Sequence, residues 1–241
     1  MCYQKALTKE LETVQKYMQR QLLEPDSYTP YYALNGFTHG NIYIVPIDQP
    51  DIISAATWGL VPPYKMNVIN DFFKNGWNTL NARSEDIFDN KTYKAHTDQR
   101  CLMIADGVIE PHHYDKKNSQ PFFMYQPNEM FDDGKGLMCI AGLYSMDSNN
   151  NYYVTMLTID GNDTFNEVHN KAKRMPLILN ENFFDYWVDK SLNEGDIKEV
   201  IKAGVTNENF NYYPITNDIY KGANPFDKSV INRVEPNGLM L

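Results

Sequence analysis

The chain has 241 residues, and its 22 lysines and arginines stand against 31 aspartates and glutamates, which gives a formal net charge of −9 at pH 7. Hydrophobic residues make up 42% and charged residues 22%, which is ordinary for a globular protein and excludes a disordered, collagen-like or coiled-coil chain. No run approaches the roughly 18 uncharged residues of a membrane helix, and the first residues lack the apolar centre of a secretory signal, so we expect a cytoplasmic protein without membrane association.

The first half of the chain predicts one helix followed by strands. Residues 8–23 are expected to form an amphipathic helix, because Leu11, Val14 and Met18 recur at a spacing of three to four residues. Over residues 41–60, short apolar stretches are separated by proline and aspartate, which indicates strands and turns.

The second half predicts more strands and then two short helices. Three strand-like runs lie between residues 100 and 158, namely CLMIADGVIE, GLMCIAGLYS and NYYVTMLTI, and the turn-rich MDSNNN predicts a hairpin between the last two. ENFFDYWVDK and EGDIKEVIKAG are expected to be helices, the second ended by Gly204. With no repeat and no long linker, the chain is interpreted as one α+β domain over residues 1–241.

The cysteines point to one unusual position. Three widely spaced cysteines without a CxxC pair predict neither disulfides nor a zinc site. Cys101 and Cys139 lie in short apolar runs, where a free thiol acts as a small hydrophobe. Cys2 differs, because removal of Met1 would give it a free α-amine beside its thiol, and such a 1,2-aminothiol condenses with an aldehyde to a thiazolidine ring. The alternative is that Cys2 is an incidental residue.

Polar residues at the ends of apolar segments supply further candidates. Asn81, Glu110 and His169 hold such positions, and a carboxylate with an imidazole could shuttle the protons of an aldehyde condensation. Each also has a structural interpretation, as a turn residue, a rim carboxylate and a surface histidine. The cations around Arg174 could hold a phosphate or form a solvated turn, and the negative net charge requires any nucleic-acid contact to be local.

No cofactor or metal is expected. The chain contains neither a glycine-rich phosphate loop nor a GxSxG motif, and the adjacent His112 and His113 have no third ligand at a diagnostic spacing.

Six blocks in the chain resemble one known family. Met-Cys at the start is followed in order by WGLVPPY, NARSED, RCLMIADGVIE, IAGLYS and a histidine five residues before RMPLIL. Together they resemble the SRAP family, the SOS response-associated peptidases, which include sensors of abasic sites in DNA. The chain departs from the family at Tyr3 and Gln4, where Gly-Arg is usual, at Tyr64, where Trp is usual, and at Pro111, where an aromatic residue is expected.

The resemblance implies a reaction and a set of roles. Cys2 would form a thiazolidine crosslink with the ring-opened aldehyde of an abasic site in single-stranded DNA, which would shield the lesion during the DNA-damage response. Asn81 would hold the sugar or the Cys2 amine, Glu110 would assist ring opening and proton transfer, and His169 would act as acid or base. The DNA contacts implied are phosphate binding by two arginines and an apolar wall for flanking bases, at Arg83, Arg174, Trp58 and Pro62.

The resemblance also implies a fold and leaves alternatives open. The expected fold is a strongly curved, mostly antiparallel sheet that closes toward a barrel and is flanked by helices. We expect a monomer that associates with the nucleoid when bound to DNA and that could also have lyase activity. The alternatives are a thiol peptidase that acts through Cys2 and at least removes Met1, and a DNA-binding module without catalysis.

Overall fold

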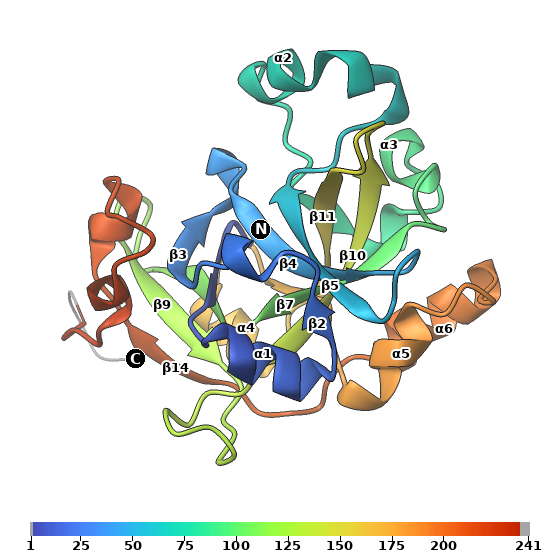
Figure 1. Ribbon diagram of the computed structural model, residues 1–241. Coiled ribbons are helices and arrows are strands. Elements are labelled where there is room, and N and C mark those ends of the chain that lie inside the picture. Colours follow the sequence, from blue (N-terminus) through green and yellow to red (C-terminus); the bar gives the residue numbers. More distant parts are fainter. Residues whose placement is uncertain (1, 237–241) are drawn as a thin grey trace.

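The computed structural model describes residues 2–236 and shows a mixed α+β fold built on two sheets (Figure 1). One sheet has five strands in the order β14-β9-β8-β1-β3, and the other has nine, with the main path β12-β11-β10-β7-β4-β5-β2. Most pairings are antiparallel. The predicted class, an α+β fold with a curved and mostly antiparallel sheet, is confirmed.

The larger sheet is partly ring-like, because its path returns on itself. β5 pairs with β4 on one side and in parallel with β11 on the other, so five strands form a closed cycle of pairings. These strands are β4 (Asn41–Pro46), β5 (Ile52–Trp58), β7 (Arg100–Ala105), β10 (Met138–Met146) and β11 (Tyr152–Asp160). Almost all residues of β7 and β10 are buried, as expected for strands covered on both faces.

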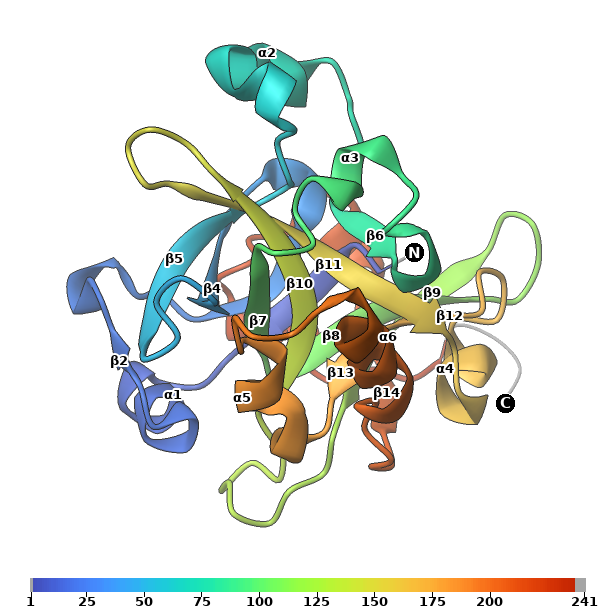
Figure 2. The same cartoon turned by 90° about the vertical axis from the view of Figure 1, so that its right-hand side faces the viewer.

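Short strands extend this ring. β6 runs parallel to β11, β13 pairs with β10, and β12 and β2 lie at the ends of the path. Their bounds are β2 (Gln21–Leu22), β6 (Asn81–Arg83), β12 (Arg174–Pro176) and β13 (Ile178–Leu179). β6 and β12 pair with the same end of β11, which brings two parts of the chain far apart in sequence to one place (Figure 2).

The five-stranded sheet contains the N-terminal strand, which was not predicted. Its strands are β1 (Gln4–Leu7), β3 (Tyr31–Asn35), β8 (Gly107–His113), β9 (Ser119–Tyr125) and β14 (Asn211–Pro214). β1 pairs antiparallel with both β3 and β8. The start of the chain is therefore fixed inside a sheet.

The run CLMIADGVIE, predicted as one strand, is two strands in two different sheets. The chain turns at Asp106 and Gly107, where the buried Asp106 carboxylate accepts hydrogen bonds from the Thr8 amide and hydroxyl at 2.8 and 2.5 Å. A Cβ on Gly107 would lie 2.1 Å from the Phe123 ring, so only glycine fits. The uniform apolar pattern hid this corner.

Helices cover the outer faces of the sheets, and the arm that carries α2 extends away from them (Figure 1). The helices are α1 (Leu11–Met18), α2 (Ile69–Lys74), α3 (Lys91–Lys94), α4 (Asp163–Val168), α5 (Phe184–Trp187) and α6 (Glu194–Ala203). The predicted helix over residues 8–23 is shorter, because Gln19 has a φ of 53° and ends it in the left-handed region. α6 ends at Gly204 as predicted and begins with a capping box between Asn193 and Asp196.

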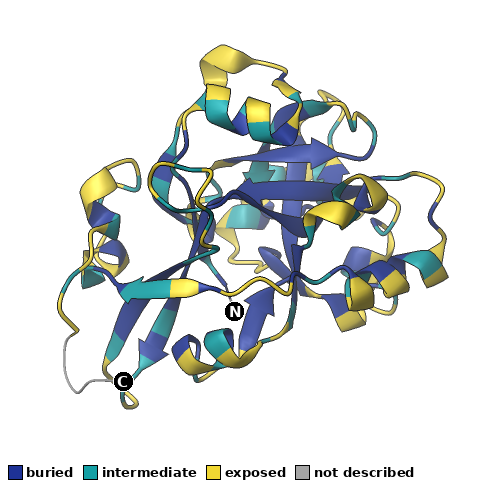
Figure 3. Ribbon diagram, turned by 90° about the horizontal axis from the view of Figure 1, so that it is seen from below, coloured by how far each residue is buried: buried dark blue, intermediate teal, exposed yellow. Residues whose placement is uncertain are grey.

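The strands form the buried centre, and the loops and outward helix faces carry the exposed residues (Figure 3). Trp58 and Trp187 are among the largest fully buried side chains. Cys101 and Cys139 are buried free thiols, which confirms their predicted structural role. None of the helices in the described part of the chain is long and apolar enough to cross a membrane.

Candidate active site at the start of the N-terminal strand

The pairing of β1 with β8 brings Cys2 close to Glu110. Gln4 pairs with Ile109, so the same antiparallel register continued by two residues brings Cys2 alongside Pro111, the residue that follows Glu110 in β8. The side chains of Cys2 and Glu110 are both fully buried. A local feature of the sheet, its register, thus positions a thiol beside a carboxylate.

Asn81 holds the backbone of Cys2. It begins β6, and its Nδ2 donates a hydrogen bond of 2.8 Å to the Cys2 carbonyl oxygen. Tyr93, which belongs to α3, donates a hydrogen bond of 3.1 Å from its hydroxyl to the Asn81 carbonyl oxygen. The Asn81 side chain itself is buried. Its amide therefore fixes where the start of the chain lies.

His169 is supplied by the end of α4. It is the C-cap residue of that helix, and its Nδ1 lies 3.0 Å from the Arg174 carbonyl oxygen and 3.3 Å from Glu110 Oε2. The ligand atoms of Cys2, Glu110 and His169 all lie within 4.8 Å of one another. Three elements distant in sequence thus bring a thiol, a carboxylate and an imidazole together.

Burial changes the protonation of all three groups. It raises the pKa of Glu110 to about 7 and lowers the pKa of His169 to about 4, because the charged form of each loses its hydration. It also raises the pKa of the Cys2 thiol, to which the neighbouring Glu110 carboxylate contributes. At neutral pH, His169 is uncharged, Cys2 is a thiol, and Glu110 can gain or lose a proton.

Arg174 is a structural ion-pair centre rather than an open cation. Its guanidinium makes two hydrogen bonds to the Glu85 carboxylate, at 2.7 and 3.0 Å, and one of 2.7 Å to Asp160, and it also donates to the Thr158 carbonyl oxygen. A phosphate would have to compete with two carboxylates. Arg83, at the end of β6, has an exposed side chain, so of the two predicted phosphate-binding arginines it is the accessible one.

Trp58 and Pro62 do not form an exposed wall, which corrects their predicted role. Trp58 is fully buried at the end of β5, and its indole nitrogen donates to the Leu80 carbonyl oxygen at 3.0 Å. Pro62 is also buried. Neither ring can stack on a base in this conformation.

Two exposed aromatic residues, Phe37 and Trp77, were not singled out in the sequence analysis. Phe37 is 55% exposed and packs on Tyr3, with ring centroids 4.7 Å apart, and the Asn78 side chain donates to the Tyr3 hydroxyl at 2.9 Å. Tyr64 and Trp77, on the arm that carries α2, are also exposed. Trp77 follows the turn-forming Asn75-Gly76, and that turn was the sequence signal for an exposed position.

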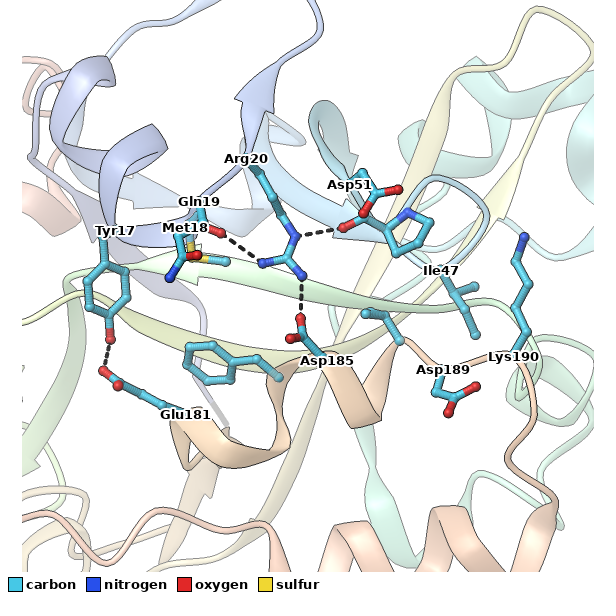
Figure 4. A pocket seen from close by; sticks show the side chains of 13 residues that line it. Tyr17, Met18, Gln19, Arg20, Ile47, Asp51, Glu181, Asp185, Asp189 and Lys190 are labelled. Atoms are coloured by element: carbon cyan, nitrogen blue, oxygen red, sulfur yellow. Dashed lines mark hydrogen bonds and ion pairs between the residues drawn. The ribbon is translucent and has the colours of Figure 1, made fainter.

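A large groove in the described surface lies elsewhere. It has a volume of about 830 Å³ and lies between α1 and α5, where Arg20 contacts Asp185 and Tyr17 contacts Glu181 (Figure 4). Its lining is strongly charged and includes none of the predicted catalytic residues. The predicted catalytic residues therefore lie together outside this groove.

Comparisons with known proteins identify a family for this chain. The family model described as SOS response associated peptidase (SRAP) matches residues 1–222. None of the curated proteins matches the chain.

Three solved structures are similar in fold. A protein from Bacteroides thetaiotaomicron has a TM-score of 0.81 and 23% identity, covering 97% of this chain and 100% of that one. A protein from Bordetella bronchiseptica has a TM-score of 0.65 and 19% identity, covering 90% and 100%. A phage-related protein from the same organism has a TM-score of 0.62 and 21% identity, covering 89% and 94%.

Proposed function

We propose that this chain, which belongs to the SOS response-associated peptidase (SRAP) family, crosslinks itself through Cys2 to abasic sites in single-stranded DNA after Met1 is removed. The observation that supports this most is the convergence of the Cys2, Glu110 and His169 ligand atoms within 4.8 Å in a buried setting. The proposed outcome is a covalent shield over the lesion.

The reaction needs both functional groups of a processed Cys2. Its amine adds to the aldehyde of the ring-opened deoxyribose, and the carbinolamine loses water to give an imine. The thiol sulfur then adds to the imine carbon while its proton passes to the imine nitrogen, which closes the thiazolidine ring. One water molecule leaves in all, and no oxidant or reductant is needed.

Glu110 is suited to move these protons. A group with a pKa near 7 exists in both forms at neutral pH, which is the condition for an efficient general acid and base. It can accept the thiol proton and protonate the departing hydroxyl. We assign the relay of a proton, or a contact to the sugar, to His169, which is neutral at this pH and lies 3.3 Å from Glu110 Oε2.

Asn81 positions the nucleophile rather than reacting. Its hydrogen bond to the Cys2 carbonyl oxygen restrains the residue whose amine and thiol must both reach one carbon atom. Its Oδ1 has no hydrogen-bond partner within residues 2–236, so it is available to the Cys2 amine or to a sugar hydroxyl.

DNA would be held by a local surface. Arg83 supplies an exposed cation, and the aromatic pair of Tyr3 and Phe37, with Trp77 on the neighbouring arm, supplies flat apolar faces on which bases can stack. An abasic nucleotide has no base to unstack, so its presentation lacks the unstacking cost of flipping a normal base. Because the salt dependence scales with the number of phosphates that cations contact, binding through this local surface would weaken with salt in proportion to those few contacts.

The test is a crosslinking assay. Protein shown by mass spectrometry to lack Met1 is mixed with a single-stranded oligonucleotide that carries one abasic site, and a band that survives heat and SDS is quantified. We expect the band with the wild type, none with Cys2→Ser, and slower formation with Glu110→Gln, while Cys101→Ala serves as a matched thiol control. Absence of the band from folded, processed wild-type protein would contradict the proposal. Shortened DNA in the same gel would reveal lyase activity.

A peptidase activity is the second candidate, because the family description names one and because Cys2 lies near a histidine. The raised pKa of the Cys2 thiol argues against an activated thiolate. The test is synthesis without methionine aminopeptidase, followed by mass spectrometry. Removal of Met1 in the wild type but not in Glu110→Gln would support self-processing.

A further inference from the structure

The site combines three kinds of metal-binding atom. A thiol sulfur from Cys2, a carboxylate oxygen from Glu110 and an imidazole nitrogen from His169 lie within 4.8 Å of one another, and all three side chains are buried. Within residues 2–236, this is the one group of three or more histidine, cysteine or acidic side chains whose ligand atoms cluster in this way.

Processing of the chain would add a fourth donor. Removal of Met1, which the proposed function also requires, frees the α-amine of Cys2. The amine nitrogen and the thiol sulfur of one cysteine are joined through two carbons, so together they close a five-membered chelate ring on a metal ion. The processed chain would then offer four donors, three of which already lie within 4.8 Å of one another.

We propose that Zn²⁺ binds Cys2, Glu110 and His169 in the processed protein and reversibly blocks the nucleophile. Zn²⁺ takes thiolate, imidazole, amine and carboxylate ligands in a tetrahedral arrangement, whereas Mg²⁺ and Ca²⁺ prefer oxygen ligands alone. On binding, the thiol proton leaves to solvent and the sulfur lone pair forms the bond to the metal. Because the aldehyde needs the same amine and sulfur, metal binding and crosslinking exclude each other.

The geometry requires only a small contraction. Ligand bonds of about 2.0–2.3 Å in a tetrahedral zinc site place the ligand atoms roughly 3.3–3.8 Å apart. The present limit of 4.8 Å therefore has to shrink by about 1.0–1.5 Å when the metal binds. The N-terminal position of Cys2 lets its amine and thiol adjust together.

The binding test uses no DNA. Processed protein is titrated with Co²⁺, whose bond to a thiolate gives a charge-transfer band in the near ultraviolet, and Zn²⁺ is then added to displace it. We expect one equivalent bound, a band that is absent in Cys2→Ser, and affinity at least tenfold weaker in Glu110→Gln and in His169→Ala. Cys101→Ala and Cys139→Ala control for the other thiols. A protein with an extra N-terminal residue, which keeps Cys2 in a peptide bond, should also bind at least tenfold more weakly.

The second arm adds DNA and separates this inference from the proposed function. Saturating Zn²⁺ should slow crosslinking at least tenfold, and a chelator should restore the rate. Metal binding by a processed protein that never crosslinks would contradict the proposed function and leave the metal site intact. Crosslinking without any cobalt band or zinc effect would overturn the metal site, as would a cobalt band that persists in folded Cys2→Ser.

Discussion

Glu110 Oε2 lies 3.3 Å from His169 Nδ1, and both side chains are buried. Burial acts on the two groups in opposite directions, because it raises the pKa of the acid to about 7 and lowers the pKa of the base to about 4. The pair is therefore uncharged at mildly acidic pH, and Glu110 is the member that titrates near neutrality. In the proposed reaction, this inversion would supply a proton-transfer group near neutral pH.

Glu110 should reduce the stability of the folded protein at neutral and alkaline pH. Its folded pKa lies above its unfolded value, so the folded protein holds the Glu110 proton more tightly than the unfolded chain does. The free energy of unfolding is therefore highest below about pH 4.5, where both states are protonated, and this stability is lost as the pH rises through about 7. We expect Glu110→Gln to raise the free energy of unfolding relative to the wild type by up to about 3 kcal/mol at pH 8, and by much less at pH 4.5. Denaturant unfolding at both pH values measures this. An advantage that is equal at both, or larger at pH 4.5, would contradict the assigned shift.

Asn81 should affect the rate more than the stability. Asn81→Ala removes the hydrogen bond to the Cys2 carbonyl oxygen, and such a bond contributes about 1 kcal/mol, which corresponds to a roughly fivefold slower crosslink. Single-turnover crosslinking at saturating DNA measures the change. If Asn81→Ala crosslinks at the wild-type rate while Glu110→Gln is slow, Asn81 does not position the nucleophile.

Substitutions of the two arginines should differ in their effect on the stability of the fold. Arg174→Lys loses the two-point contact with Glu85, which lysine cannot reproduce. Because Glu85 and Asp160 are partly or largely exposed, we expect a loss of about 1–2 kcal/mol of stability and not more. Arg83→Ala should leave stability unchanged.

DNA binding should depend on Arg83 rather than on Arg174. Arg83→Ala should weaken binding of single-stranded DNA and lower the slope of log affinity against log salt by about one. Fluorescence anisotropy across a salt series measures both quantities. Unchanged binding by Arg83→Ala, together with a strong loss in folded Arg174→Lys, would reverse the assignment.

Trp77 and Trp58 should also differ, the first in its effect on DNA binding and the second in its effect on stability. Trp77 is 53% exposed, so Trp77→Ala should weaken DNA binding with little effect on the melting temperature. Trp58→Phe removes the indole hydrogen bond to the Leu80 carbonyl oxygen inside the core and should lower the melting temperature by several degrees without altering DNA affinity. Thermal melts with anisotropy titrations check both. Loss of affinity in a fully stable Trp58→Phe would contradict the corrected role.

Local patterns were enough to predict the class of fold. The alternating and continuous apolar runs predicted β10, β11 and the hairpin between them, and Gly204 predicted the end of α6. The short β1 and the corner at Gly107 were missed, because both depend on partners distant in sequence. Sheet register, which no local pattern contains, determines that Cys2 lies beside Glu110.

For the site as well, the sequence predicted the residue types but not the contacts between residues distant in sequence. The residue types of Cys2, Glu110 and His169 suggested aldehyde chemistry, but their closeness arises from β1, β8 and α4 meeting in three dimensions. Trp58 was assigned to the wrong environment because a tryptophan at the end of a strand can point inward or outward, and packing against Gly36 and Leu80 decides it. Arg174 was assigned to phosphate because its partners Glu85 and Asp160 lie far from it in sequence or on a neighbouring strand.

Intact mass spectrometry of the crosslink identifies the bond formed at Cys2. Processed protein is incubated with abasic single-stranded DNA without any reducing agent, and the adduct is then digested and sequenced. For a thiazolidine, we expect a mass equal to protein plus DNA minus one water, with the modification on Cys2 and no dependence on borohydride. An adduct on another residue, or one that survives only after borohydride reduction, would contradict it.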